Sequence, residues 1–231
     1  MKTRHYFSIA MAIAISYGSP ALAADGEECK PIVMSDPGWT NINSTNGVAT
    51  VLLEALGYEP DVKTLSVPIG YQSMKNGEID VFLGNWMPAQ QKFIDDLNSA
   101  KAVEVLKKNL TGAKFTLAVP TYVAEGGVKD FKDLNAHADK FDSEIYGIEP
   151  GAPANANIQK MIDANDFDLG KWKVKESGEQ GMLSQVARNE GDKKWIVFLA
   201  WAPHPMNSRF DLTYLSGGDE YFGPDYGGAE V

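Results

Sequence analysis

Residues 81–88 read Val-Phe-Leu-Gly-Asn-Trp-Met-Pro, and residues 197–203 read Val-Phe-Leu-Ala-Trp-Ala-Pro. In both, an apolar run typical of a buried strand leads to a small residue and then to a tryptophan and a proline. Residues 32–39 resemble them, with Trp39 after a strand-like run and close to a proline. Because the carboxyl ends of parallel strands carry ligand-facing loops, we expect Trp39, Trp86 and Trp201 to converge on one cleft. Tryptophan is also common in protein cores, so the spacing leaves a purely structural role open.

The rest of the chain alternates between helical and strand-like patterns. Apolar residues at 48, 51, 52, 55 and 56 form a helical stripe that ends at Gly57. We expect further helices at 93–106, 130–141, 154–164 and 181–189, and strands at 31–34, 62–67, 114–119, 145–148, 172–175 and 195–199. This alternation predicts an α/β fold with a mostly parallel sheet covered by helices.

Two lobes are expected from the places where the pattern changes. A boundary is expected near residues 109–114, and a return crossing near 201–210. We therefore assign residues 24–111 to lobe I, 112–206 to lobe II, and 207–231 to an incomplete return crossing toward lobe I. The cleft between two such lobes is a natural place for a ligand.

The first 23 residues have the features of a secretory signal peptide. Lys2 and Arg4 precede an apolar stretch at 6–15, and Ala21-Leu22-Ala23 is a small-x-small cleavage pattern. The apolar stretch is too short to cross a bilayer as a helix. A hydrophobic first helix of the fold is the less favoured alternative. We expect cleavage after Ala23 and export of the mature chain.

Composition and charge exclude several kinds of partner and site. The 231 residues carry a formal net charge of -10, which disfavours nucleic acids and anionic membranes but not a cationic ligand. One cysteine, three histidines and the absence of a nucleotide-binding motif lead us to expect no metal and no cofactor. Cys29 is the only cysteine in a chain expected to be exported, so it is either a free thiol or has a missing partner.

Indole faces carry negative electrostatic potential and attract a cation that lies over them. A quaternary ammonium group suits such faces, because its charge is spread over methyl groups and it has no N–H donor to leave unpaired. If the three tryptophans do converge, a methylated cation is therefore the ligand that their chemistry favours.

At this point the chain resembles a known family. The stretches Asp36-Pro37-Gly38-Trp39-Thr40, 80–88, 146–151, 179–183, 201–207 and 214–219 are similar to the periplasmic substrate-binding proteins of quaternary-amine ABC transporters, in particular the choline-binding branch. The resemblance implies a two-lobed periplasmic binding protein fold (type II) whose cleft closes by a hinge. It also implies that a C-terminal part is truncated, and that this part would supply helices to lobe I and a partner for Cys29.

The resemblance also implies the ligand-binding residues. The family's aromatic box falls on Trp39, Trp86, Trp201 and Phe115, the last standing where the choline branch usually has tyrosine. Asn41 replaces an aspartate, and Ala152 replaces an asparagine, that typically read the choline hydroxyl. Two hypotheses stay open: the changed pocket tolerates or prefers a zwitterion such as glycine betaine or carnitine, or choline remains the ligand.

The function implied is that of a non-enzymatic, monomeric periplasmic receptor. It would capture choline or a related quaternary ammonium compound, such as an osmoprotectant betaine, and present it to a membrane permease and its ATPase. The alternatives are an exported enzyme or a sensory domain for a small cationic metabolite. Glu149 and Glu179 are interpreted as solvated or hinge residues, and His204 as a loop residue.

Overall fold

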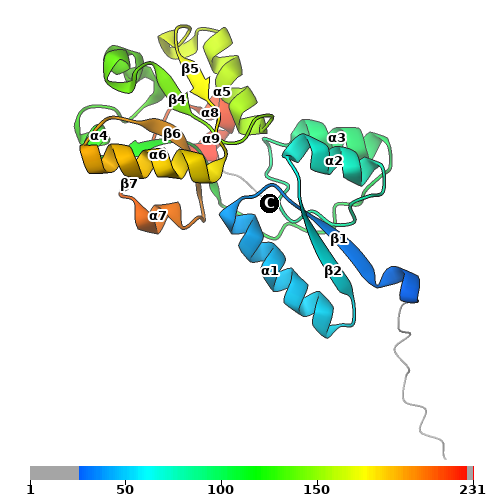
Figure 1. Ribbon diagram of the computed structural model, residues 1–231. Coiled ribbons are helices and arrows are strands. Elements are labelled where there is room, and N and C mark those ends of the chain that lie inside the picture. The colour runs from blue at the N-terminus through cyan, green and yellow to red at the C-terminus, as the bar shows by residue number, and fades with distance from the viewer. Residues whose placement is uncertain (1–25, 228–230) are drawn as a thin grey trace, which may run out of the picture.

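The structure is a computed structural model that describes residues 26–227 and 231, so the expected signal peptide lies outside the described residues. Figure 1 shows two α/β lobes side by side. Lobe I contains the elements from η1 to α3, and lobe II those from β3 to α9. The elements are η1 (Glu27–Cys29), β1 (Pro31–Asp36), α1 (Thr40–Ala55), β2 (Glu59–Thr64), α2 (Val67–Lys75), α3 (Gln91–Ser99), β3 (Lys114–Pro120), α4 (Thr121–Glu125), η2 (Phe131–Asp133), η3 (Asn135–Phe141), β4 (Glu144–Tyr146), α5 (Pro153–Asp163), η4 (Asp166–Asp168), β5 (Lys173–Lys175), α6 (Glu179–Asp192), β6 (Val197–Ala202), α7 (Met206–Arg209), β7 (Leu212–Tyr214), α8 (Asp219–Phe222) and α9 (Pro224–Gly227).

Lobe I is built on a small parallel sheet. Strands β1 and β2 pair in parallel, with α1 as the connection between them. The apolar run after α2 adds a single bridge, from Val81 to Met34, rather than a full strand. The chain then turns through Trp86 into α3 and crosses to lobe II without regular structure at residues 102–113.

Lobe II contains a five-stranded sheet of order β5-β4-β6-β3-β7. Strand β4 is parallel to β5 and β6, whereas β3 is antiparallel to both β6 and β7. The sheet is therefore mixed. The expectation of a mostly parallel sheet holds for the pairings of β4 and is wrong for the two pairings of β3. The physical reason lies in the crossing: β3 enters the lobe beside the point where β6 ends, so Lys114 pairs with Ala202 and the two strands run in opposite directions.

The core of lobe II lies on both faces of this sheet. Leu117, Val119, Ile145, Val197 and Phe198 are fully buried, and each such side chain stabilises the fold by about 1.5–3 kcal/mol. Residues 207–227 also belong here, because β7 pairs with β3 and α8 packs against α5. The return toward lobe I is seen only at Val231, whose backbone pairs with that of Leu110.

Helix α1 is longer than its apolar stripe predicts, and this positions the site. It begins at Thr40, directly after Trp39, instead of near residue 48. The stripe itself is exposed among the described residues: Val48, Val51, Leu52 and Leu56 have 60–74% of their surface accessible. Thus the first turn of α1 lies at the cleft, while its apolar face lies away from any described part of the chain.

Candidate ligand-binding site

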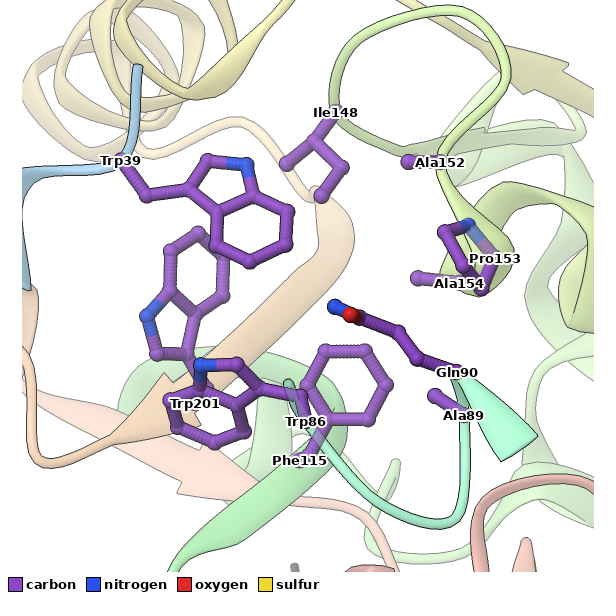
Figure 2. Close-up of a pocket in the computed structure, with 10 residues that line it drawn as sticks. All are labelled: Trp39, Trp86, Ala89, Gln90, Phe115, Ile148, Ala152, Pro153, Ala154 and Trp201. Carbon is purple, nitrogen blue, oxygen red and sulfur yellow. The ribbon is translucent and has the colours of Figure 1, made fainter. Parts of the chain in front are cut away.

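One small cavity lies between the lobes and collects side chains from both (Figure 2). The space between its side chains amounts to about 330 Å³ with open solvent included, and a water-sized sphere can enter only about 10 Å³ of it. The residues that line it, called the aromatic cavity below, are Trp39, Trp86, Ala89, Gln90, Phe115, Ile148, Ala152, Pro153, Ala154 and Trp201.

Four aromatic rings form one side of the aromatic cavity, and the other side is formed by small or aliphatic side chains together with Gln90. Trp39 and Trp86 come from lobe I, Phe115 from β3 and Trp201 from β6. The rings are 3–8% exposed, and the centroids of Trp86 and Phe115 lie 5.8 Å apart. Four rings from four separate segments therefore converge: the three tryptophans as the spacing predicts, although Trp201 lies within β6 rather than after it, and Phe115 as the resemblance implies.

A tight turn aims Trp39 at the cavity. The buried carboxylate of Asp36 accepts a hydrogen bond of 2.7 Å from the backbone N–H of Gly38, whose φ of 87° favours glycine. The chain then enters α1 with Trp39 as the N-cap residue in an extended conformation. The sequence Asp36-Pro37-Gly38 thus determines the direction in which the indole points.

Ala152 lines the aromatic cavity but Asn41 does not. Asn41 is the second residue of α1, and its Oδ1 accepts a hydrogen bond of 3.2 Å from Nε1 of Trp201. Its side-chain carbonyl is therefore used to hold an aromatic wall from lobe II. The other five residues expected to bind ligand lie on the cavity surface, and Asn41 lies one layer behind it.

Glu149 makes the corresponding contact to Trp39. The indole Nε1 of Trp39 donates to both carboxylate oxygens of Glu149, at 3.2 and 3.1 Å. Burial raises the pKa of the Glu149 carboxyl above its ordinary value, and the hydrogen bond from Trp39 offsets part of that rise. Sequence reasoning missed this role, and the only signal for it was the presence of Glu149 in a stretch shared with the family.

A second carboxylate, Glu179, joins the lobes beside the aromatic cavity. Its Oε2 accepts a hydrogen bond of 2.9 Å from the backbone N–H of Thr40, and its Oε1 accepts one from the Thr40 hydroxyl. Helix α1 has no side-chain N-cap of its own, so a residue of the opposite lobe satisfies its first N–H. Gln180 adds a 3.1 Å bond to the same hydroxyl.

His204 supports Glu179 from behind. Its Nε2 lies 3.1 Å from Oε1 of Glu179, and its Nδ1 accepts a hydrogen bond of 2.9 Å from the backbone N–H of Met206. Since Nδ1 accepts, the proton of a neutral imidazole is on Nε2, which lies close to the carboxylate but outside hydrogen-bond geometry with it. Burial alone would raise the pKa of Glu179, but the close contact with His204 and the hydrogen bonds from Thr40 outweigh it and lower that pKa. Glu179 is thus buried rather than solvated, and His204 lies in the loop between β6 and α7 as expected, but buried against Glu179.

The electrostatics of the site favour a cation. No lysine or arginine occurs among the described residues that line the aromatic cavity, and the carboxylates of Glu149 and Glu179 lie just behind its wall. The one polar side chain of the lining besides the indoles is Gln90, whose amide donates to the Gly84 carbonyl and accepts from the Tyr71 hydroxyl. Nothing in this lining supplies a positive group for a ligand carboxylate.

Within residues 26–227 and 231, no group of three or more histidine, cysteine, aspartate or glutamate side chains is arranged to hold a metal ion. In the same part of the chain, no helix has the length and apolar character needed to cross a membrane.

Comparison with known families gives one clear match. A family model described as the substrate binding domain of an ABC-type glycine betaine transport system matches residues 30–231. The glycine betaine/carnitine transport binding protein GbuC of Listeria monocytogenes is 28% identical over 120 residues, which are 52% of this chain and 40% of that protein.

Solved structures agree with this match. An ABC-transporter choline binding protein in complex with choline is 56% identical, with a TM-score of 0.87 over 90% of this chain and 72% of its own. An ABC-transporter choline binding protein in an unliganded semi-closed conformation, also 56% identical, has a TM-score of 0.81 over 89% of this chain and 71% of its own. Lactococcal OpuAC, closed on glycine betaine, is 28% identical, with a TM-score of 0.76 over 87% of this chain and 74% of its own. These similarities confirm the expected resemblance and the two-lobed binding-protein fold.

Proposed function

Because the chain belongs to the family of substrate-binding domains of ABC-type glycine betaine transport systems, we propose that its aromatic cavity binds a quaternary ammonium compound. The family consists of binding proteins and not of enzymes, in agreement with the missing catalytic motifs. The bound solute is delivered to the permease and ATPase subunits of an importer.

One observation carries the choice of ligand class: four aromatic rings from four chain segments line a single cavity that contains no positive side chain among its described residues. Each ring face contributes about 0.5–2 kcal/mol to the binding of a desolvated cation. Four faces together with methyl burial supply the ~8 kcal/mol that corresponds to micromolar affinity.

The surroundings of the cavity favour a full cation such as choline over a zwitterion such as glycine betaine or carnitine. The hypothesis of a zwitterion preference rested on the missing carboxylate at position 41 and on the Asn41 amide as a donor, but Asn41 lies outside the lining and its Oδ1 accepts from Trp201. Glu149 and Glu179 repel a ligand carboxylate at close range, and this repulsion is strong where water is excluded.

The protein acts outside the cytoplasmic membrane, after removal of residues 1–23, and as a monomer. Support for export comes from the basic start, the apolar stretch and the cleavage pattern of the sequence. In a Gram-negative cell this places the receptor in the periplasm, where it meets the outer face of its permease.

Calorimetric titration of the purified protein with choline, glycine betaine and carnitine tests the proposal. We expect micromolar or tighter binding of choline, and binding of glycine betaine that is at least ten-fold weaker. Tighter binding of glycine betaine would refute the preference for a full cation. Failure of all three to bind would refute the quaternary ammonium ligand itself.

A further inference from the structure

Two indoles of the aromatic cavity are held across the cleft in opposite directions. Trp39 of lobe I donates to Glu149 of lobe II, and Trp201 of lobe II donates to Asn41 of lobe I. Each lobe therefore supplies one aromatic wall and the acceptor that orients the wall of the other lobe. The third indole, Trp86, makes no such bond, and its buried Nε1 has no partner in the described part of the chain.

The Trp39 bond depends on the loop after β4. Glu149 follows Ile148, which itself lines the cavity, and its carboxylate spans the indole N–H with both oxygens. Glu149 is half-buried in this arrangement, and Trp39 is 6% exposed. A buried indole N–H without an acceptor destabilises the structure by the full free-energy cost of its desolvation. The orientation of the Trp39 ring is therefore coupled to the position of Glu149.

The Trp201 bond depends on the start of α1. Asn41 lies in the first turn, directly after Thr40, which Glu179 of lobe II holds by two hydrogen bonds. Trp201 is 3% exposed and is packed on its other side against the His204 ring, with centroids 4.8 Å apart. The indole N–H of Trp201 can therefore donate to Asn41 only when the start of α1 lies against lobe II.

The geometry points to Glu149 and Asn41 as positioning residues that orient the cavity indoles from the opposite lobe, so that the aromatic cavity acquires its full shape only when the lobes are closed. This inference rests on the proposed function and adds residues to it that do not touch the ligand. Closure and cavity formation become one event, because both bonds cross the cleft and neither can form in a separated lobe.

The test uses pairs of variants that separate the acceptor from the rest of the side chain. Glu149→Ala and Asn41→Ala remove the acceptor oxygen, whereas Glu149→Gln and Asn41→Asp keep an oxygen that can accept the indole N–H. Glu125→Ala and Asn98→Ala, at exposed positions outside the cavity lining, are matched controls. Choline is the probe. Its Kd is measured by calorimetry and its dissociation rate by stopped-flow fluorescence. The midpoint of thermal unfolding shows whether each variant is folded.

We expect each alanine variant to bind choline about ten-fold or more weakly, chiefly through faster dissociation, with an unfolding midpoint close to that of the parent. The two acceptor-retaining variants should stay within about three-fold of the parent Kd, given the size of a single hydrogen bond. Alanine variants that bind as tightly as the controls would overturn the inference. So would Gln and Asp variants as weak as the alanine variants, since the acceptor oxygen would then not be what matters.

A second measurement keeps the inference separate from the identity of the ligand. Spin labels at Ser99→Cys on lobe I and Lys132→Cys on lobe II, in a Cys29→Ser background, report the distance between the lobes. We expect both alanine variants to lose closed population relative to the parent even without ligand, and an unchanged distance distribution would overturn the positioning role. If the parent closes but binds no quaternary amine, the proposed function fails while this measurement still decides the role of Glu149 and Asn41.

Discussion

Trp39 offers the sharpest test of cation binding, because its ring lines the aromatic cavity while its backbone only caps α1. Replacing Trp39 by Leu keeps apolar volume but removes one aromatic face and the hydrogen bond to Glu149. The lost face is worth about 0.5–2 kcal/mol, and the lost bond to a charged group about 1.5–3 kcal/mol. Since the Leu side chain recovers part of the apolar contact, we expect choline affinity to fall by at least ten-fold, which is about 1.4 kcal/mol.

The assay compares choline with its neutral isostere 3,3-dimethyl-1-butanol, which has the same shape without the charge. Calorimetry on the parent, Trp39→Leu and Trp39→Phe gives the discrimination between the two ligands in each protein. Because only the cation is attracted by the ring quadrupole, the discrimination should shrink in Trp39→Leu and be partly kept in Trp39→Phe. Trp195→Phe, at a partly buried position that packs against the core and does not line the cavity, is the control. Equal discrimination in the parent and in Trp39→Leu would refute cation binding by this ring.

Three further predictions concern the ligand tail, the interlobe carboxylate and the exposed helix face. Gln90, the one polar lining side chain besides the indoles, is engaged with Tyr71 and Gly84, so no lining side chain is left to bind the choline hydroxyl. Tetramethylammonium, which lacks that hydroxyl, should therefore bind within about ten-fold of choline in calorimetry. A hundred-fold loss would show that the protein hydrogen-bonds the choline hydroxyl. The pKa of Glu179 is lowered from its ordinary value of 4.5, so its ionised form stabilises the fold above that pH and the contribution disappears as pH falls through the lower folded-state pKa. The stability advantage of the parent over Glu179→Gln in urea titrations should therefore be largest near pH 7 and shrink below about pH 4.5, and a pH-independent difference would contradict the role given to this carboxylate. The exposed stripe on α1 should bind the dye ANS, and replacing Leu52 and Leu56 together by Lys should reduce the dye fluorescence without loss of helical circular dichroism; unchanged fluorescence would place the dye elsewhere.

Much of the secondary structure follows from local pattern. The strands expected at 114–119 and 195–199 and the helices at 154–164 and 181–189 occur within a few residues of these bounds. The helix expected at 93–106 ends at Ser99, and the strand-like run that begins at Val81 forms one bridge instead of a strand. Such runs are ambiguous, because the pattern records that side chains are buried and not which backbone they pack against.

The start of α1 shows why the apolar stripe misleads. Residues 40–47 are mostly polar, so no helix is expected there from periodicity. Their helix is satisfied at its N-terminus by Glu179, a residue 139 positions away along the chain. Tertiary contact therefore sets the boundary, and the same contact brings Asn41 to Trp201.

The amino-acid sequence alone indicated the kind of site, since three tryptophans each follow a strand-like run near a proline, and the family resemblance added Phe115 as a fourth aromatic wall. Only the tertiary structure decided which acceptors Trp39 and Trp201 use, that Asn41 lies behind the wall, and that Glu149 and Glu179 join the lobes beside the cavity, with His204 packed behind Glu179. The reason is physical: residue type sets what a side chain can bind, whereas a hydrogen bond across the cleft exists only when two lobes, each folded around its own sheet, come within about 3 Å of one another at that point.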